Sequence, residues 1–292
     1  MPESSALANP DPENVRLVVG CGYVGVRVAA RWQAQGRRVL AITRHRSREL
    51  SEAGIVPILA DITKQATLNI LPAYAAVVYC VGFDRNASPS MRDVYVRGLS
   101  NVLAVLPRGG RFIYVSSTSV YGDADGDWVD ETSPTDPIDE SGRIVLEAEE
   151  LLRRERPGAI ILRFAGIYGP GRSLRRVEAL RAGEPIAADP DKWLNLIHAD
   201  DGAAAVLATE QRGQAGEAYN VCDGVPVRRG EFFTRLAGLL GASPPSFTQH
   251  PSGRDRGNRR VANRRMRDEL RVALEYPSYV EGLAASMPSS PE

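Results

Sequence analysis

The sequence predicts an α/β protein, built on a doubly wound parallel sheet of the Rossmann type with a small C-terminal substrate lobe. Three observations predict this class. Short apolar runs alternate with longer amphipathic runs over residues 15–164, glycines recur at a fixed spacing just after the first apolar run, and Pro and Gly become frequent after residue 171. Such alternation is typical of repeated βαβ units.

Six short apolar runs are interpreted as strands. Each is four or five residues long and bounded by Gly, Pro or polar residues, as expected of strands that are buried on both faces; they are 15–19, 38–42, 56–59, 76–80, 111–115 and 159–163. Helices are predicted between them. In the first helix Val24, Val28 and Trp32 recur every four residues and form one apolar stripe. Two further helices are predicted at 91–106 and 143–156.

A glycine-rich segment follows the first predicted strand and opens the first predicted helix, and it consists of Gly20, Cys21, Gly22, Tyr23, Val24 and Gly25. In βαβ units with this spacing, the first glycine permits a tight turn, the second lets the backbone approach a pyrophosphate, and the third lets the helix pack on the strand. The helix N-terminus adds a partial positive charge. The segment therefore predicts the pyrophosphate site of a nicotinamide dinucleotide, with a strand-to-helix turn that binds no ligand as the alternative.

The residues after the second predicted strand indicate which dinucleotide is bound. An Asp or Glu about 20 residues after the loop would accept a hydrogen bond from the ribose 2′-hydroxyl of NAD. Here Thr43, Arg44 and Arg46 occupy that segment, and no carboxylate is present. Guanidinium groups suit a 2′-phosphate, so the sequence favours NADP. A solvated basic loop, with NAD as the cofactor, stays open as the alternative.

The ends of the next two strands complete the predicted cofactor site. Asp61 and Ile62 follow the third strand and are predicted to hold the adenine, and Cys80, Val81 and Gly82 close the fourth strand beside the expected ribose. Ligands of open parallel sheets bind at the carboxyl ends of the strands. Each position also fits an ordinary strand-to-loop turn.

Domain boundaries follow from these elements. Residues 1–14 are polar, without a basic start or an apolar core, and are interpreted as a disordered leader rather than a signal peptide. Residues 15–170 are predicted to form the dinucleotide-binding Rossmann domain, to which 195–222 returns. Residues 171–194 and 223–292 are predicted to form the small substrate lobe.

Composition argues against several classes of protein. Lys plus Arg equals Asp plus Glu at 36 each, so no net charge attracts nucleic acid or a membrane surface. The three cysteines and three histidines lack metal-ligand spacing, so neither a metal site nor a disulfide framework is predicted. No apolar run approaches the ~20 residues that cross a bilayer. Three free thiols suit a reducing compartment, which favours a cytoplasmic location.

Four further motifs occur in order along the chain, at residues 112–122, 163–171, 195–201 and 219–221. Together with the glycine loop they resemble the extended short-chain dehydrogenase/reductases, the NAD-dependent epimerase/dehydratase family, over most of the chain. The resemblance implies an NAD(P)-binding oxidoreductase or epimerase. Its substrate would be an anionic carbonyl or a nucleotide-sugar-like compound.

The resemblance also implies roles for residues near the fifth strand. It places at Ser117 the hydroxyl that hydrogen-bonds the reacting oxygen, with Ser116 beside it as a cofactor contact. The family's acid/base Tyr and its Lys would open the next helix, but Ser141 and Val145 stand at those positions. A serine hydroxyl has no accessible anion near pH 7, and valine supplies no positive charge. The chain is therefore identified as an atypical member that lacks the Tyr-x-x-x-Lys motif.

Two tyrosines are candidates for the missing acid. Tyr95 stands where the family has a supporting Asn, and Tyr121 is the landmark tyrosine of the 112–122 motif. For Tyr95 the alternative is a packing or hydrogen-bonding role. For Tyr121 the alternative is a place in the substrate cleft or the core.

A basic segment near the C-terminus contains eight arginines, which are Arg254, Arg256, Arg259, Arg260, Arg264, Arg265, Arg267 and Arg271. Solvated or ion-paired side chains are one interpretation, and contacts to a small anionic substrate are the other, since arginine binds phosphate and carboxylate bidentately. No aromatic residue is interleaved here, which argues against nucleic acid.

Two functions from different classes remain. The first is the NAD(P)-dependent oxidoreductase or epimerase described above. The alternative is a non-catalytic NADP-binding redox sensor or partner-binding module, which would explain the missing Tyr and Lys. The helices predicted at 91–106 and 143–156 correspond to those that pair in the family's dimers, which favours a homodimer.

Overall fold

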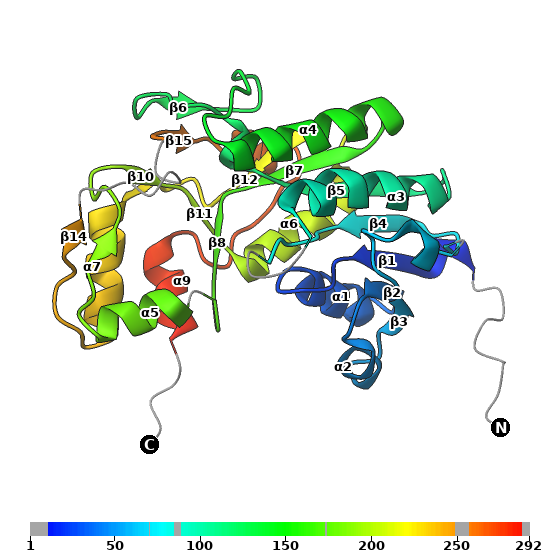
Figure 1. Ribbon diagram of the computed structural model, residues 1–292, viewed down its shortest axis with the longest axis horizontal. Coiled ribbons are helices and arrows are strands. Elements are labelled where there is room, and N and C mark those ends of the chain that lie inside the picture. The colour runs from blue at the N-terminus through cyan, green and yellow to red at the C-terminus, as the bar shows by residue number, and fades with distance from the viewer. Residues whose placement is uncertain (1–10, 70, 85–88, 173, 249–256, 288–292) are drawn as a thin grey trace. The chain divides into compact units, whose positions relative to one another are not determined.

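A computed structural model describes residues 11–69, 71–84, 89–172, 174–248 and 257–287 (Figure 1). The predicted leader, residues 1–14, lies outside the described residues as far as residue 10, and Pro12–Asn14 form a short 3₁₀ turn, η1. The chain divides into two compact units. Unit 1 comprises Met1–Val115, Glu147–Ile161 and Thr209–Glu217, and unit 2 comprises Ser116–Leu146, Leu162–Ala208 and Ala218–Glu292.

A seven-stranded sheet has the order β12-β7-β5-β4-β1-β2-β3. Its strands are β1 (Val15–Val19), β2 (Arg38–Thr43), β3 (Val56–Leu59), β4 (Ala76–Tyr79), β5 (Arg111–Ser117), β7 (Ile160–Phe164) and β12 (Ala218–Val221). β1 pairs in parallel with β2 and β4, β2 with β3, and β4 with β5. Six strands match the predicted runs to within two residues, and β12 belongs to the 195–222 stretch. The predicted Rossmann-type α/β fold is confirmed.

Burial explains why the strands could be recognised as uninterrupted apolar runs. Every residue of β1, β4, β7 and β12 is buried, as expected where helices cover both faces of a parallel sheet. β3 is different because it is the edge strand, and its Val56 and Leu59 are exposed. Pro57 in β3 is tolerated there, since an edge strand has a backbone side without a partner.

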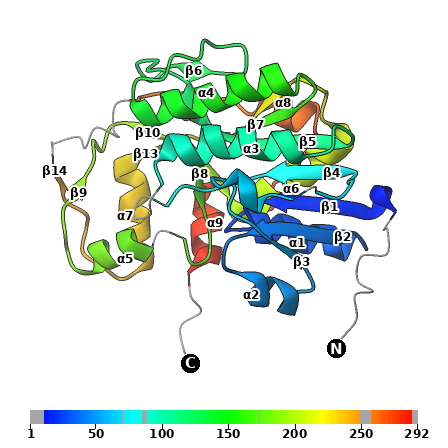
Figure 2. The same cartoon turned by 45° about the vertical axis from the view of Figure 1, so that its right-hand side comes forward.

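The helical elements of unit 1 are α1 (Gly25–Ala34), α2 (Ser47–Glu52), the 3₁₀ turn η2 (Gln65–Thr67), the π-helix η3 (Asp93–Arg97) and α3 (Gly98–Val105), which continues directly from η3. Two more helices, α4 (Glu140–Glu155) and α6 (Ala199–Arg212), begin in unit 2 and end in unit 1. Figure 2 shows α1 and α2 on one side of the strands of unit 1 and α3 on the other.

The first helix buries the stripe that its sequence predicts. Val28 and Trp32 of α1 are fully buried. The indole of Trp32 donates to a carboxylate oxygen of Glu210 at 2.6 Å, and the guanidinium of the buried Arg16 contacts the other oxygen at 2.6 Å. The Glu210 carboxylate, whose side chain is 13% exposed, is therefore both ion-paired and hydrogen-bonded, as expected of a charge largely removed from water.

Unit 2 adds several short elements. They are the 3₁₀ turn η4 (Thr118–Val120), strands β6 (Trp128–Val129), β8 (Gly166–Tyr168), β9 (Ile186–Ala187), β10 (Trp193–Leu194), β11 (Leu196–His198), β13 (Val227–Arg228), β14 (Phe247–Thr248) and β15 (Arg260–Val261), and helices α5 (Leu174–Arg181), α7 (Arg229–Leu239), α8 (Arg264–Asp268) and α9 (Tyr279–Ser286). The strands form four two-stranded ladders, of which only β10–β13 is antiparallel. Side chains from β8, β11, α5, α7 and α9 form one apolar cluster in this unit.

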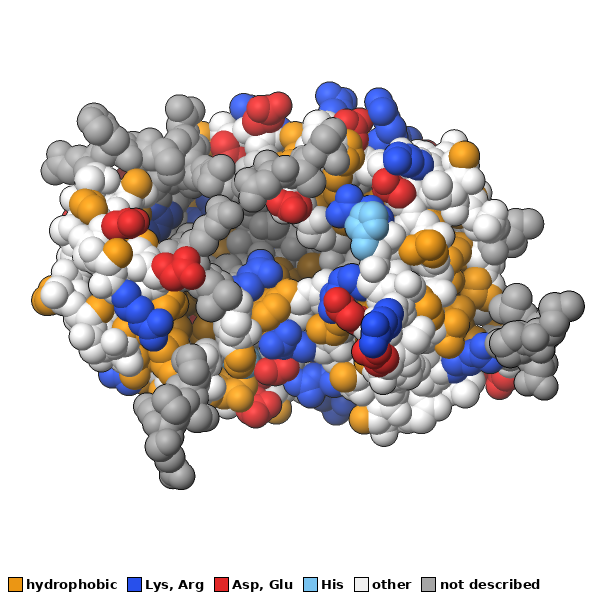
Figure 3. Space-filling view, turned by 60° about the horizontal axis from the view of Figure 1, so that its bottom comes forward, with side chains coloured by type: hydrophobic (Ala, Val, Ile, Leu, Met, Phe, Trp, Pro, Cys, Tyr) orange, Lys and Arg blue, Asp and Glu red, His pale blue; other side chains and the backbone are white. Residues whose placement is uncertain are grey.

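The distribution of charged side chains on the surface agrees with the balanced charge of the chain. Basic and acidic side chains are intermixed on the face drawn in Figure 3. Within the described ranges, no helix has both the length and the apolar character needed to cross a membrane.

Candidate functional site

Three glycines shape the segment between β1 and α1. Gly20 has a φ of 90°, and a Cβ on it would lie 2.6 Å from the Cα of Val81. A Cβ on Gly25 would lie 2.6 Å from the carbonyl oxygen of Gly20, so α1 begins against the end of the strand. A Cβ on Gly22 would meet no atom within 4 Å. The loop needs its first and third glycines for its own packing, whereas the second glycine borders open space.

The N-terminus of α1 has no side-chain cap. Val24 occupies the N-cap position and makes no side-chain capping hydrogen bond. The amide of Val26 donates to the carbonyl of Gly22 at 3.0 Å, so the helical ladder starts within the loop. A helix start of this kind presents a partial positive charge that favours an anion.

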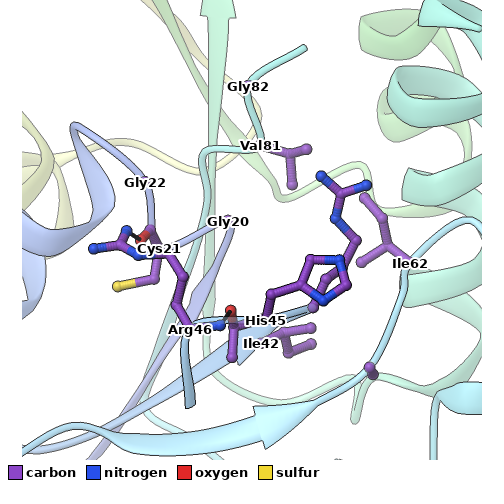
Figure 4. A pocket seen from close by; sticks show the side chains of 12 residues that line it. Gly20, Cys21, Gly22, Ile42, His45, Arg46, Ile62, Val81 and Gly82 are labelled. Carbon is purple, nitrogen blue, oxygen red and sulfur yellow. Dashed lines mark hydrogen bonds between the residues drawn. The ribbon is translucent and has the colours of Figure 1, made fainter. Parts of the chain in front are cut away.

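A pocket of about 300 Å³ opens beside this loop, within unit 1 (Figure 4). It is lined by Gly20, Cys21, Gly22, Ile42, Thr43, Arg44, His45, Arg46, Ala60, Ile62, Val81 and Gly82. All twelve come from the carboxyl ends of β1, β2, β3 and β4 or from the segments just after them. This edge of an open parallel sheet is where ligands bind. The twelve lining residues include no Asp or Glu.

Most of the residues that the sequence predicts to hold a cofactor are at this pocket. Nine of them line it, namely Gly20, Cys21, Gly22, Thr43, Arg44, Arg46, Ile62, Val81 and Gly82. Three lining residues were missed, which are Ile42, His45 and Ala60. Each adjoins a predicted residue in the sequence, so widening each predicted segment by one residue finds them all.

Six predicted cofactor residues do not line the pocket, namely Tyr23, Val24, Gly25, Asp61, Cys80 and Ser116. Asp61 accepts hydrogen bonds from the amide and the hydroxyl of Thr63, at 3.0 and 2.8 Å. Desolvation acts to raise the pKa of Asp61, but these hydrogen bonds and the charges of Arg44 and Lys64 lower it overall. The Asp61 carboxylate therefore stabilises the turn between Asp61 and Thr63.

Burial raises the thiol pKa of both cysteines near the loop. Cys80 lies under the loop, and its thiol donates to the carbonyl of Gly20 at 3.2 Å. Burial raises the pKa of Cys80, and burial raises the pKa of Cys21 to about 11 against the opposing charge of Arg46. Both thiols therefore stay protonated at neutral pH. Among the described residues, no three His, Cys, Asp or Glu side chains are grouped as metal ligands.

The two arginines after β2 have different surroundings. The Nη1 group of Arg46 donates to the carbonyl oxygen of Cys21 at 2.8 Å, and its Nε lies 2.7 Å from Oε2 of Glu49. Arg44 is exposed at the pocket, and no hydrogen bond joins its guanidinium to another described residue. In Figure 4 the Arg46 side chain lies toward Cys21, while His45 lies toward Ile62. Of these two arginines, only Arg44 has a guanidinium without a hydrogen bond to another described residue, although its charge acts on Asp61.

Ser116 and Ser117 end β5 and belong to unit 2. Ser116 is buried and Ser117 is half-buried. The Ser117 hydroxyl oxygen accepts a hydrogen bond from the amide of Ser119 at 3.1 Å and so caps the turn η4. Because Oγ is the acceptor in this bond, the hydroxyl hydrogen of Ser117 can donate to another oxygen.

Tyr121 has a buried hydroxyl with two partners. The hydroxyl donates to Oδ1 of Asn220 at 2.8 Å and accepts from Nη1 of Arg163 at 3.0 Å. The side chain is 1% exposed, and burial raises the pKa of Tyr121 although Arg163 opposes that shift. These contacts give Tyr121 a structural role, which argues against Tyr121 as the proton donor that was one of its two possible roles in the sequence analysis.

The start of α4 explains the two residues at the positions of the missing Tyr and Lys. Oδ1 of Asp139 accepts from the amide of Gly142 at 2.7 Å and from the hydroxyl of Ser141 at 2.8 Å. Asp139 therefore caps the helix, and Ser141 takes part in the cap. Val145 is buried at 6% exposure. A Cβ on Gly142 would lie 2.5 Å from the carbonyl of Ser119, so this helix start packs against η4.

Tyr95 lies in the π-helix η3 of unit 1 and is half-buried. Its ring centroid is 6.4 Å from that of Phe83, in an edge-to-face arrangement. Phe83 directly follows Gly82, which lines the pocket. Tyr95 is thus linked to the β4 side of the pocket through one side chain. Single π-helical turns are frequent at functional sites.

The basic segment near the C-terminus is partly committed to the fold. Arg254 and Arg256 lie outside the described residues. Four of the arginines have polar partners, namely Arg259, Arg260, Arg264 and Arg265. Arg259 donates to the carbonyls of Thr118 and Gly122, both at 3.0 Å, and so holds the segment after Ser117. These contacts favour a structural role for the four over contacts to a substrate.

Comparisons with known proteins indicate the family of this chain. The NAD dependent epimerase/dehydratase family matches residues 16–222. Protein YeeZ of Escherichia coli (strain K12) is 31% identical over 273 residues, which cover 89% of this chain and 95% of YeeZ. Short-chain dehydrogenase/reductase family 42E member 1 of Mus musculus is 30% identical over 272 residues, covering 80% of this chain and 69% of that protein. A solved structure from Methylobacillus flagellatus, provisionally assigned as an NAD-dependent epimerase/dehydratase, is 34% identical with a TM-score of 0.76, over 94% of this chain and 98% of that chain.

Proposed function

This chain belongs to the NAD dependent epimerase/dehydratase family, and on that premise we propose that it binds NADP and acts as an oxidoreductase or epimerase on a small anionic carbonyl or nucleotide-sugar-like substrate. One observation carries the cofactor proposal. The pocket beside the glycine loop is lined by the exposed guanidinium of Arg44 and by no carboxylate. A ribose 2′-hydroxyl would call for a carboxylate acceptor, whereas a 2′-phosphate calls for a cation.

The residues present fit a nicotinamide dinucleotide. The open space beside Gly22 and the uncapped start of α1 would take the pyrophosphate. Arg44 would donate to the 2′-phosphate, and Ile62 would contact the adenine. A bound nicotinamide dinucleotide supplies the hydride acceptor or donor of the reaction.

The first test is calorimetric titration of the nucleotide-stripped protein with NADPH and with NADH. We expect NADPH to bind at least about tenfold more tightly, since a hydrogen bond to a charged group contributes about 1.5–3 kcal/mol. In Arg44→Ala, the affinity for NADPH is expected to fall to that for NADH, and the affinity for NADH to stay unchanged. A preference of the wild type for NADH, or an intact preference for NADPH in Arg44→Ala, would refute the NADP proposal.

Two side chains are proposed for the chemistry. Ser117 donates a hydrogen bond to the reacting oxygen, since its Oγ already accepts from the Ser119 amide and its hydrogen is the remaining group. Tyr95 supplies the proton, because it is a half-buried phenol linked through Phe83 to the β4 side of the pocket.

The Ser117 proposal predicts a loss of turnover without a loss of cofactor. In Ser117→Ala we expect turnover of an anionic carbonyl substrate to fall by about 100-fold or more, as when one preorganised donor to a reacting oxygen is removed. The affinity for NADPH is expected to stay at the wild-type value. Ser119→Ala is the matched control, because it removes a neighbouring hydroxyl and keeps the amide that Ser117 accepts. Wild-type turnover in Ser117→Ala would exclude Ser117 from this role.

A non-catalytic NADP-binding redox sensor or partner-binding module is the second candidate. The observation that favours it is the start of α4, where the Ser141 hydroxyl serves the helix cap and Val145 is buried. Tight binding of NADPH, with no turnover across a panel of anionic carbonyl compounds and nucleotide sugars, would favour this candidate over the enzyme.

A further inference from the structure

Both the backbone and the guanidinium group of Arg46 are fixed by hydrogen bonds and an ion pair. Its amide donates to the hydroxyl oxygen of Thr43 at 3.1 Å, and its carbonyl accepts from the amide of Leu50 at 3.0 Å as α2 begins. Its guanidinium lies 2.7 Å from Glu49 on one side and donates to the carbonyl of Cys21 at 2.8 Å on the other. Arg46 therefore connects the start of α2 to the glycine loop, two segments that lie 25 residues apart in the sequence.

The peptide group between Cys21 and Gly22 is fixed from both sides. Its carbonyl oxygen accepts from Arg46, and its N–H donates to the carbonyl of Gly20 at 2.8 Å. A flip of this peptide would exchange the directions of its C=O and its N–H. Neither hydrogen bond could form after such a flip. The two hydrogen bonds oppose that flip.

We propose that Arg46, held by Glu49, is a positioning residue that keeps the glycine loop in its anion-binding conformation, and that it is not a ligand of the 2′-phosphate. This inference rests on the proposed function, and it assigns different roles to Arg44 and Arg46. Arg44 sets the choice between NADP and NAD. Arg46 sets the affinity for either dinucleotide, because the loop faces the pyrophosphate, which both share.

The test uses two readouts on the full-length protein. The first is hydrogen–deuterium exchange of the amides of residues 19–26 without any nucleotide, and the second is calorimetric titration with NADPH and NADH. In Arg46→Ala we expect faster exchange in this segment and an equal loss of about three- to tenfold in both affinities, the effect of one hydrogen bond. The ratio of the two affinities is expected to stay at its wild-type value.

The variant Glu49→Ala is expected to change the affinity for NADPH in opposite directions, depending on whether Arg46 positions the loop or binds the 2′-phosphate. If Arg46 positions the loop, removing Glu49 weakens both dinucleotides about two- to threefold, since exposed ion pairs contribute little. If Arg46 is a phosphate ligand, removing Glu49 frees its guanidinium and tightens NADPH alone. The matched control is Glu52→Ala, which breaks the Arg48–Glu52 pair of the same helix (2.8 Å) outside the pocket lining.

The outcomes separate this inference from the proposed function. Unchanged exchange in Arg46→Ala, a loss confined to NADPH in that variant, or tighter NADPH binding in Glu49→Ala would overturn the positioning role. A wild type that prefers NADH, or an Arg44→Ala variant without effect, would overturn the NADP proposal alone. Should the wild type bind neither dinucleotide, the exchange of residues 19–26 still decides whether Arg46 holds the loop.

Discussion

In Gly22→Val we expect the unliganded protein to melt within about 2 °C of the wild type, while the affinities for NADPH and NADH both fall by more than about 100-fold. A Cβ at Gly22 meets no atom within 4 Å, and the backbone there is outside the left-handed region, so the fold accepts a side chain. That side chain occupies the space beside the loop. The pyrophosphate must enter the same space to come within about 3 Å of the loop amides. Thermal unfolding and calorimetric titration measure the two effects.

Gly25→Val is the control for steric effects within the same loop. A Cβ there would lie 2.6 Å from the Gly20 carbonyl oxygen and 3.0 Å from Cγ1 of Val18. We expect this variant to lose about 1–3 kcal/mol of stability, because α1 must move away from β1. Wild-type binding in Gly22→Val would place the pyrophosphate elsewhere. A loss of stability in Gly22→Val as large as in Gly25→Val would trace its weaker binding to misfolding.

The sequence predicts these glycine roles because the constraints are local. The turn at Gly20 and the start of α1 at Gly25 involve neighbours along the chain and the adjacent end of β4. The strands were predictable for a related reason. A strand buried on both faces must be apolar at every position, and β1 and β4 are buried throughout.

Contacts between distant segments could not be predicted. The hydroxyl of Tyr121 is bonded to Asn220, 99 residues away, and no periodicity signals that pair. The bond from Arg46 to the Cys21 carbonyl is equally hidden, because a side chain that donates to a backbone carbonyl has no signature in the sequence. The Asp139 cap of α4 is local and was also missed, because the helix was predicted to begin at residue 143 and begins at Glu140. An Asp directly before a helix is a recognisable N-cap signal, and it accounts for the hydroxyl of Ser141.

Asp223 is another buried polar group that no sequence pattern predicted. It follows β12 in unit 2 and is 4% exposed. Oδ1 accepts from the amide of Val225 at 2.9 Å, whereas Oδ2 has no hydrogen-bond partner among the described residues. Burial, followed by the charges of Asp201 and Glu281, raises the pKa of Asp223 from 3.8 to about 7, although the Val225 amide opposes the shift. Between about pH 4 and pH 7 the folded protein therefore holds a proton on this carboxyl group that the unfolded chain releases.

We expect Asp223→Asn to be more stable than the wild type by about 2–4 kcal/mol at pH 8 and by only about 1 kcal/mol at pH 5. Because the pKa of Asp223 is higher in the folded state, its contribution to stability falls as the pH rises from about 4 to about 7 and stays constant above that window. Asparagine keeps the shape of the side chain and removes the ionisation. Urea unfolding at both pH values measures the difference, and Asp191→Asn, at an exposed position of the same unit, is expected to match the wild type at each. An equal gain for Asp223→Asn at pH 5 and pH 8 would show that Asp223 in the folded protein does not titrate between these pH values. The advantage of the neutral amide grows with pH only if the carboxyl group of the folded protein ionises.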